Sequence, residues 1–137
     1  MSRIQVVAGI IVKNTAGNER QVLLAKRNAR QHQGGLWEFP GGKVDTNEDH
    51  FSALQRELQE ELGITIQNSQ FFQEIKFDYS DKQVALDFYL ISEYTGNEHG
   101  AEGQPLKWVG LSELKNYSFP EANQAIVDRL ACGDFAF

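Results

Sequence analysis

Three glutamates, Glu57, Glu60 and Glu61, follow one another at the spacing that places side chains on one side of an α-helix. Like charges at this spacing repel by roughly a few tenths of a kcal/mol per pair, so we look for an interaction that compensates for this repulsion. A hard divalent cation supplies one, because Mg²⁺ and Mn²⁺ prefer oxygen ligands and are commonly shared between carboxylates and substrate phosphates. The alternative is a solvent-exposed acidic face with Arg56 as a partial counterion. The spacing alone leaves both interpretations open.

The loop that precedes these glutamates reads Phe39-Pro40-Gly41-Gly42-Lys43. Proline stiffens the approach, and the two glycines tolerate unusual dihedral angles and close backbone contact. Such a loop can present a carbonyl oxygen to a metal ion or amide groups to an oxyanion. A plain turn is the alternative, since Pro-Gly-Gly by itself usually marks nothing more.

A central helix must carry the glutamates. Thr46 or Asn47 can cap its start, and Gly63 follows its expected end at Leu62. Phe51, Leu54, Leu58 and Leu62 form an apolar stripe along it. Apolar runs and alternation predict the strands, and Ser118 with Pro120 opens a last helix to about Leu130. The expected strands cover residues 6–12, 21–27, 36–39, 75–79, 84–94 and 106–109.

Length and charge narrow the class of protein. The chain has 137 residues and one cysteine, which predicts a single domain over residues 1–137 without disulfides, in a reducing compartment. No apolar run is long enough for a membrane span, so we expect a cytoplasmic protein. We also expect a monomer, because no long apolar pattern indicates a surface that a partner would cover. Of the net charge of −6, the segment from Asp45 to Glu61 contributes −5, with six acidic residues and Arg56. This charge disfavours a nucleic-acid polymer as partner, whereas metal ions could still bridge the acidic segment to a small phosphate compound.

The glycine loop and the helix together resemble the signature box of the Nudix hydrolase family. The matching pattern is Gly42, five residues, Glu48, seven residues, then Arg56-Glu57-Leu58-Gln59-Glu60-Glu61-Leu62-Gly63-Ile64. The resemblance implies an α/β Nudix fold with a mixed β-sheet sandwiched between helices (α/β/α), which the order of strands and helices also suggests. It further implies hydrolysis of phosphoric anhydrides with Mg²⁺, for which Mn²⁺ could substitute.

The same resemblance implies roles for individual residues. Metal ligands would be the Gly41 carbonyl, Glu57, Glu60, Glu61 and, from a later loop, Glu102. Arg56 would orient a carboxylate, Glu48 would support the site, and either Glu57 or Glu60 could take the proton of the attacking water. Glu102 is a further candidate for that base. The implied substrate-binding residues are Arg27, His32, Glu38, Phe39, Gly42, Lys43 and Asn123.

Segments outside the box resemble the branch of the family that hydrolyses 8-oxo-dGTP to the monophosphate and pyrophosphate. They are Val7-Ala8-Gly9-Ile10-Ile11, Lys26-Arg27 followed by His32, Glu38 to Lys43, Glu102-Gly103-Gln104-Pro105 and Phe119-Pro120-Glu121-Ala122-Asn123. In that branch, the asparagine corresponding to Asn123 reads the oxidised guanine, and its amide offers one donor face and one acceptor. Lys82 stands where relatives have arginine, which leaves its role open.

Two alternatives remain. Gly35-Leu36-Trp37-Glu38-Phe39 is also similar to the branch that hydrolyses cytidine nucleotides. The other alternative is a domain that binds nucleotides without hydrolysing them. The complete set of box glutamates speaks against it, because binding alone would not require all of them. The Glu102 loop and the Asn123 segment favour the enzyme for oxidised guanine nucleotides, which would prevent mutations by cleaning the nucleotide pool.

Overall fold

A computed structural model describes residues 3–14, 19–27 and 35–134. The elements in chain order are β1 (Ile4–Asn14), β2 (Arg20–Lys26), β3 (Trp37–Glu38), β4 (Gly41–Lys43), α1 (His50–Leu62), β5 (Thr65–Asp78), β6 (Gln83–Thr95), β7 (Leu106–Gly110), the 3₁₀ helices η1 (Leu111–Asn116) and η2 (Glu121–Asn123), and α2 (Gln124–Cys132). Within the described ranges, no helix is both long and apolar enough to cross a membrane.

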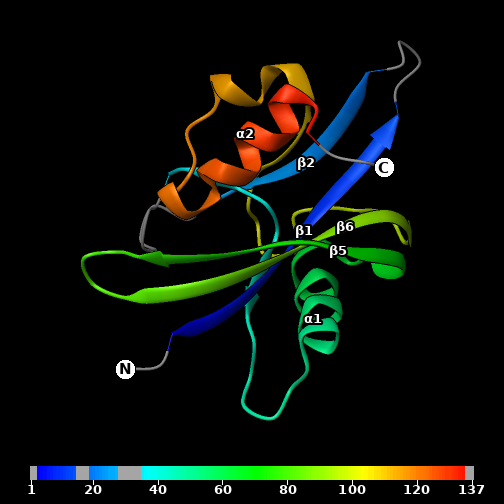
Figure 1. Ribbon diagram of the computed structural model, residues 1–137. Coiled ribbons are helices and arrows are strands. Elements are labelled where there is room, and N and C mark those ends of the chain that lie inside the picture. The colour runs from blue at the N-terminus through cyan, green and yellow to red at the C-terminus, as the bar shows by residue number, and fades with distance from the viewer. Residues whose placement is uncertain (1–2, 15–18, 28–34, 135–137) are drawn as a thin grey trace.

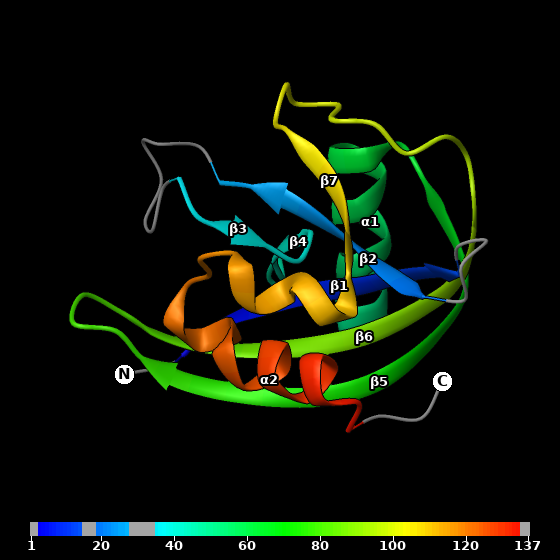
Figure 2. The ribbon, with the colours of Figure 1, turned by 90° about the horizontal axis from the view of Figure 1, so that it is seen from above.

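The strands form a mixed sheet in the order β3-β2-β1-β6-β5, with β4 paired to β1 and β7 paired to β2. Strands β1 and β6 run parallel, and the other pairs are antiparallel. Figure 1 shows α1 and α2 on opposite sides of this sheet, and Figure 2 shows α2 above β5 and β6. The predicted mixed sheet between helices is confirmed.

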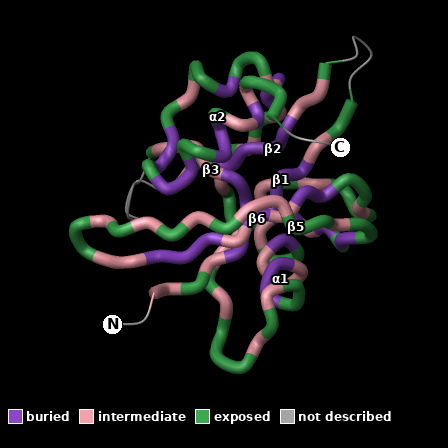
Figure 3. The backbone as a smooth tube through the Cα atoms, in the orientation of Figure 1, coloured by how far each residue is buried: buried purple, intermediate pink, exposed green. Residues whose placement is uncertain are grey.

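Two apolar clusters, one on each side of the sheet, hold the helices in place (Figure 3). On the α1 side, Leu54, Leu58 and Leu62 are completely buried, as the stripe predicts. Phe51 differs from the prediction, because it lies in the first turn of α1 and stays 48% exposed. The cluster on the other side joins α2 and η1 to the sheet.

Several boundaries differ from those predicted. Strand β5 begins at Thr65, ten residues before the expected start, because it pairs with β6 along its whole length through three register shifts. Its first half has no simple alternation of apolar and polar residues, so periodicity does not reveal it. The sequence pattern predicts neither β4 nor η1. Helix α2 begins at Gln124 after the separate turn η2, not at Ser118.

Candidate metal and substrate site

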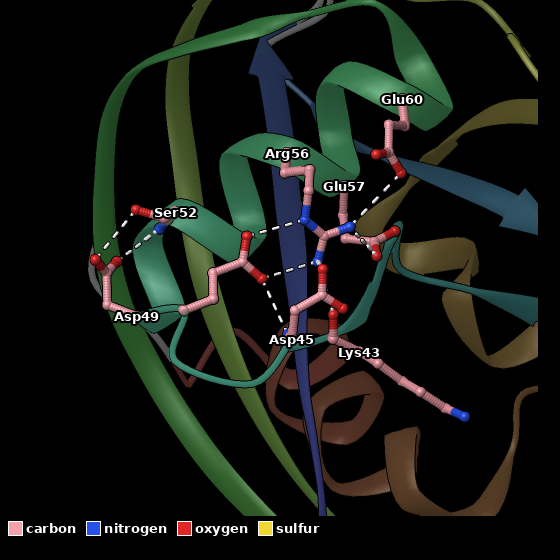
Figure 4. Close-up of polar contacts among 8 residues, drawn as sticks. Lys43, Asp45, Asp49, Ser52, Arg56, Glu57 and Glu60 are labelled. Carbon is pink, nitrogen blue, oxygen red and sulfur yellow. Dashed lines mark hydrogen bonds and ion pairs between the residues drawn. The ribbon is translucent and has the colours of Figure 1, made fainter.

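Asp49, immediately before α1, fixes where the glutamate-bearing helix begins. Its carboxylate accepts a hydrogen bond from the Ser52 backbone N–H at 2.8 Å, which caps the helix (Figure 4). The predicted caps, Thr46 and Asn47, are therefore wrong: both precede the cap, and Asn47 adopts a positive φ of 66°. The end of the helix is as predicted, with Gly63 in the left-handed conformation that suits glycine.

Gly41 packs against β1 and Gly42 against the helix, each more closely than a side chain would allow. Strand β4 pairs with β1, where Gly41 lies opposite Ala8. A Cβ on Gly41 would collide with the backbone oxygen of Val7, and one on Gly42 would overlap the carboxylate of Glu57. The Gly41 N–H also donates to Glu61 Oε2 at 3.0 Å. The glycines thus place backbone atoms directly beside two of the three helix glutamates.

Arg56 is the centre of a network that connects the loop, the helix entrance and the helix. It donates to both Glu48 oxygens at 2.9 Å and to the Lys43 carbonyl at 3.0 Å. It also donates to Glu57 Oε1 at 2.9 Å, and its Nη1 lies 3.6 Å from Glu60 Oε2. Hydrogen bonds from Arg56 and from the Asp45 backbone lower the pKa of Glu48 to about 2, and hydrogen bonds to Glu48 raise the pKa of Arg56. Figure 4 shows these groups converging on the guanidinium.

Among the site carboxylates, Glu61 has the most strongly raised pKa. Burial, followed by the charges of Glu38, Glu57 and Glu102, raises the pKa of Glu61 to about 8, although the Gly41 N–H acts in the opposite direction. Burial also raises the pKa of Glu57 despite its contact with Arg56. The negative charges of neighbouring carboxylates repel one another, so each makes ionisation of the others less favourable. A divalent cation would offset that repulsion, and their oxygens are the ligands that Mg²⁺ and Mn²⁺ prefer.

The described carboxylates do not converge on a single point. Among the described residues, no group of three or more His, Cys, Asp or Glu side chains is close enough to form a ready metal site. Arg56 holds the Glu57 carboxylate, and the Gly41 N–H holds that of Glu61. Glu60 is more than half exposed, and Arg56 Nη1 lies 3.6 Å from its carboxylate. The donor set fits a divalent ion, and binding would have to reorient these side chains.

A cavity of about 660 Å³ opens beside the helix. Glu61 and Glu102 line it together with Arg27 and Glu38, so the structure brings four of the predicted residues to one space. Gln104 connects the Glu102 loop to the helix: its amide donates to the Glu61 carbonyl at 3.0 Å and accepts from the Glu102 N–H at 3.0 Å. The sequence indicates only that Gln104 belongs to a matching segment, because its side-chain role depends on the tertiary fold.

A second, smaller cavity of about 90 Å³ contains Asn123. Asn123 is the one buried polar side chain in the described parts of the chain, at 5% exposure. No hydrogen bond joins its side chain to another described residue. Tyr79, Lys82, Arg27 and Glu38 also line this cavity. A buried amide without a partner is costly, so its place at a cavity points to a polar ligand.

Arg27 and Glu38 line both cavities and separate them. Arg27 Nη1 lies 2.6 Å from Glu38 Oε2, and both side chains are mostly buried. Burial raises the pKa of Glu38, while Arg27 and, more weakly, Lys82 act to lower it. Lys82 therefore lies close enough to the site to affect its charge.

Three of the expected substrate-binding residues are placed elsewhere or not described. Phe39 is 2% exposed and packs between Phe88 and Phe119, with ring centroids 5.9 and 5.7 Å away, so it belongs to the core behind the site. The Lys43 side chain is exposed and extends away from Arg56 in Figure 4. His32 lies outside the described residues.

Comparisons with known proteins agree with this geometry. A family model described as "NUDIX domain" matches residues 8–129. The 8-oxo-dGTP diphosphatase of Haemophilus influenzae is 42% identical over 127 residues, covering 93% of this chain and 90% of the relative. The CTP pyrophosphohydrolase of Escherichia coli is 34% identical over 128 residues, covering 93% and 91%. A solved structure from a study of MutT from Aliivibrio salmonicida and Vibrio cholerae is 41% identical, with a TM-score of 0.80 and coverage of 96% and 99%.

Proposed function

Because this chain belongs to the Nudix family, we propose that it is a Mg²⁺-dependent 8-oxo-dGTP diphosphatase that releases the monophosphate and pyrophosphate. The observation that carries the proposal is the pair of adjoining cavities. One is lined by carboxylates that suit a metal and phosphates. The other holds the buried Asn123 amide, which has no hydrogen-bond partner among the described residues and suits a base. Arg27 and Glu38 lie between them, where the sugar of a nucleotide would pass.

The metal ligands proposed are Glu57, Glu60, Glu61 and Glu102, with the Gly41 carbonyl as a further oxygen. Bound Mg²⁺, or Mn²⁺ in its place, would neutralise phosphate oxygens and lower the pKa of the attacking water. The raised pKa of Glu61 in the metal-free protein supports this assignment.

The protein's own groups would position the reaction. Arg56 holds Glu57 in place through a direct hydrogen bond, and Glu48 fixes Arg56 with two contacts. Glu57, Glu60 and Glu102 remain alternative acceptors for the water proton. Gly42 is proposed to let the substrate approach the backbone, while Lys43 and His32 stay predictions as substrate contacts.

The base is proposed to bind at Asn123. Its amide can donate one hydrogen bond and accept another, which suits the edge of a purine. The small cavity has room for only part of a base, so the rest would lie against Tyr79 and toward Arg27. Phe39 would support this pocket from the core rather than contact the base.

The experiment measures Mg²⁺-dependent pyrophosphate release from 8-oxo-dGTP, dGTP, CTP and ADP-ribose. We expect the highest kcat/KM for 8-oxo-dGTP, and a smaller preference over dGTP in Asn123→Ala. The matched control is Asn116→Ala, an exposed asparagine in η1. A kcat/KM for 8-oxo-dGTP no higher than for dGTP would refute the substrate.

CTP hydrolysis is the second candidate, favoured by the CTP pyrophosphohydrolase relative. A higher kcat/KM for CTP than for 8-oxo-dGTP would establish it instead. Absence of turnover with any of the four compounds, together with measurable nucleotide binding, would point to a noncatalytic domain. A monomeric state and a cytoplasmic location are also proposed, and sedimentation and cell fractionation would test them.

A further inference from the structure

The hydroxyl of Tyr79 connects two segments that line the smaller cavity, the β5–β6 hairpin and η2. Tyr79 follows β5 at the tip of the β5–β6 hairpin, and its Oη accepts a hydrogen bond from the Ala122 backbone N–H at 3.0 Å. Ala122 lies in η2, lines the same cavity and is 2% exposed. This bond therefore joins segments 43 residues apart in the chain.

The bond supplies a cap that η2 otherwise lacks. Pro120 precedes η2 and has no side-chain group that could accept a hydrogen bond from the turn. Among the described residues, Tyr79 is the acceptor found for the Ala122 N–H. A buried N–H without a partner costs stability, so loss of the Tyr79 hydroxyl would loosen this short turn or admit water to it.

Asn123 comes directly after Ala122 and depends on the same turn. Its own N–H donates to the Pro120 carbonyl at 2.9 Å, while its side chain is buried at the cavity without a partner in the described chain. Because no other described residue orients the side-chain amide by a hydrogen bond, the amide takes its position from the backbone that carries it. The Tyr79 hydroxyl holds that backbone.

The hairpin side of the connection is itself well fixed. The Tyr79 N–H donates to the Lys82 carbonyl at 2.8 Å, which closes the hairpin turn. The Tyr79 ring packs against Phe77, with ring centroids 4.7 Å apart. Arg3 binds the same hairpin through the carbonyls of Phe77 and Val84. These contacts hold the hairpin turn, and with it the position of the Tyr79 hydroxyl, in place.

We propose that Tyr79 is a positioning residue for substrate selectivity, whose hydroxyl holds η2 so that the Asn123 amide can read the base. The inference rests on the proposed function, since it assumes that Asn123 contacts the base. It assigns Tyr79 no contact with the reacting phosphates.

The test compares Tyr79→Phe with the wild type, measuring kcat/KM for 8-oxo-dGTP and dGTP and the melting temperature. We expect the 8-oxo-dGTP to dGTP ratio to fall about three- to tenfold, the scale of one lost hydrogen bond, mainly through a higher KM for 8-oxo-dGTP. The matched control is Tyr94→Phe, which removes a partly buried hydroxyl near Glu98, away from both cavities. Its ratio should stay at the wild-type value.

A double variant separates positioning from general support. In an Asn123→Ala background, Tyr79→Phe should leave the ratio unchanged, because the residue through which it acts is gone. A wild-type ratio in Tyr79→Phe, or an equal loss for both substrates, would overturn the inference. A wild-type enzyme without any preference for 8-oxo-dGTP would instead refute the proposed function, so the two failures are distinguishable.

Discussion

Arg27 Nη1 lies 2.6 Å from Glu38 Oε2, and this ion pair forms the boundary between the two cavities of the site. Arg27 directly follows β2, and Glu38 lies in the short strand β3, which pairs with β2 through Ala25 and Glu38. The pair is only partly accessible to water, so each charge depends on the other.

Arg27→Met should therefore lower both stability and activity. It leaves the Glu38 carboxylate mostly buried without its cation, and the free energy of unfolding should fall by about 1–3 kcal/mol. We expect kcat/KM for 8-oxo-dGTP to fall at least about tenfold. Urea unfolding and steady-state kinetics measure the two effects, with Lys76→Met on the exposed part of β5 as control.

The double variant Arg27→Met/Glu38→Gln should recover stability but not activity, because it removes the uncompensated charge without restoring the pair. A double variant as unstable as Arg27→Met would contradict the role given to the Glu38 charge.

Glu57→Gln and Glu60→Gln should each lower kcat by about two or more orders of magnitude, the scale of acid–base and charge-stabilising losses. Each variant keeps the shape of the side chain and removes its charge, so Mn²⁺ titration should also show weaker binding. Glu74→Gln, an exposed carboxylate on β5, is the control. Unchanged turnover in both site variants would exclude their assignment.

Gly42→Ala and Gly41→Ala should fail in different ways. The Cβ on Gly42 overlaps the Glu57 carboxylate, whose side chain can turn aside, so we expect kcat to fall roughly tenfold or more with little change in melting temperature. The Cβ on Gly41 meets the Val7 backbone, which cannot turn aside, so unfolding should become easier by about 1–3 kcal/mol. Full activity in Gly42→Ala would show that the contact with Glu57 is dispensable.

The stability of the metal-free protein should fall as pH rises above 5. Glu61 has a pKa of about 8 when folded and an ordinary value of 4.5, so between these values the folded state binds a proton that the unfolded state has released. The raised pKa values of Glu38 and Glu57 act in the same direction. Urea unfolding in EDTA from pH 5 to pH 8 measures the decline.

Glu61→Gln should flatten this pH dependence, because it removes the titrating group and keeps the shape. Added Mg²⁺ should reduce the decline in the wild type, since a bound cation favours the ionised carboxylate. A wild-type stability that rises across this pH range would rule out the electrostatic account of Glu61.

The sequence by itself determined the central helix, its end at Gly63, the mixed sheet between helices and the cluster of box glutamates. These features follow from local rules: apolar periodicity, a glycine that accepts the left-handed conformation, and charged residues at fixed helical spacing. The start of the helix was harder, because several residues between Thr46 and Asp49 can cap, and only the observed backbone selects Asp49.

Only the tertiary structure decided how the site is divided. Strand β4 forms because it pairs with β1. Its glycines have no side chains, so the carboxylates of Glu57 and Glu61 can lie against the β4 backbone. The boundary made by Arg27 and Glu38, and the hydrogen bond from Ala122 to Tyr79, also join residues through folding rather than through spacing. Long-range pairing places these groups, and no pattern along the chain encodes a contact between segments that meet only in three dimensions.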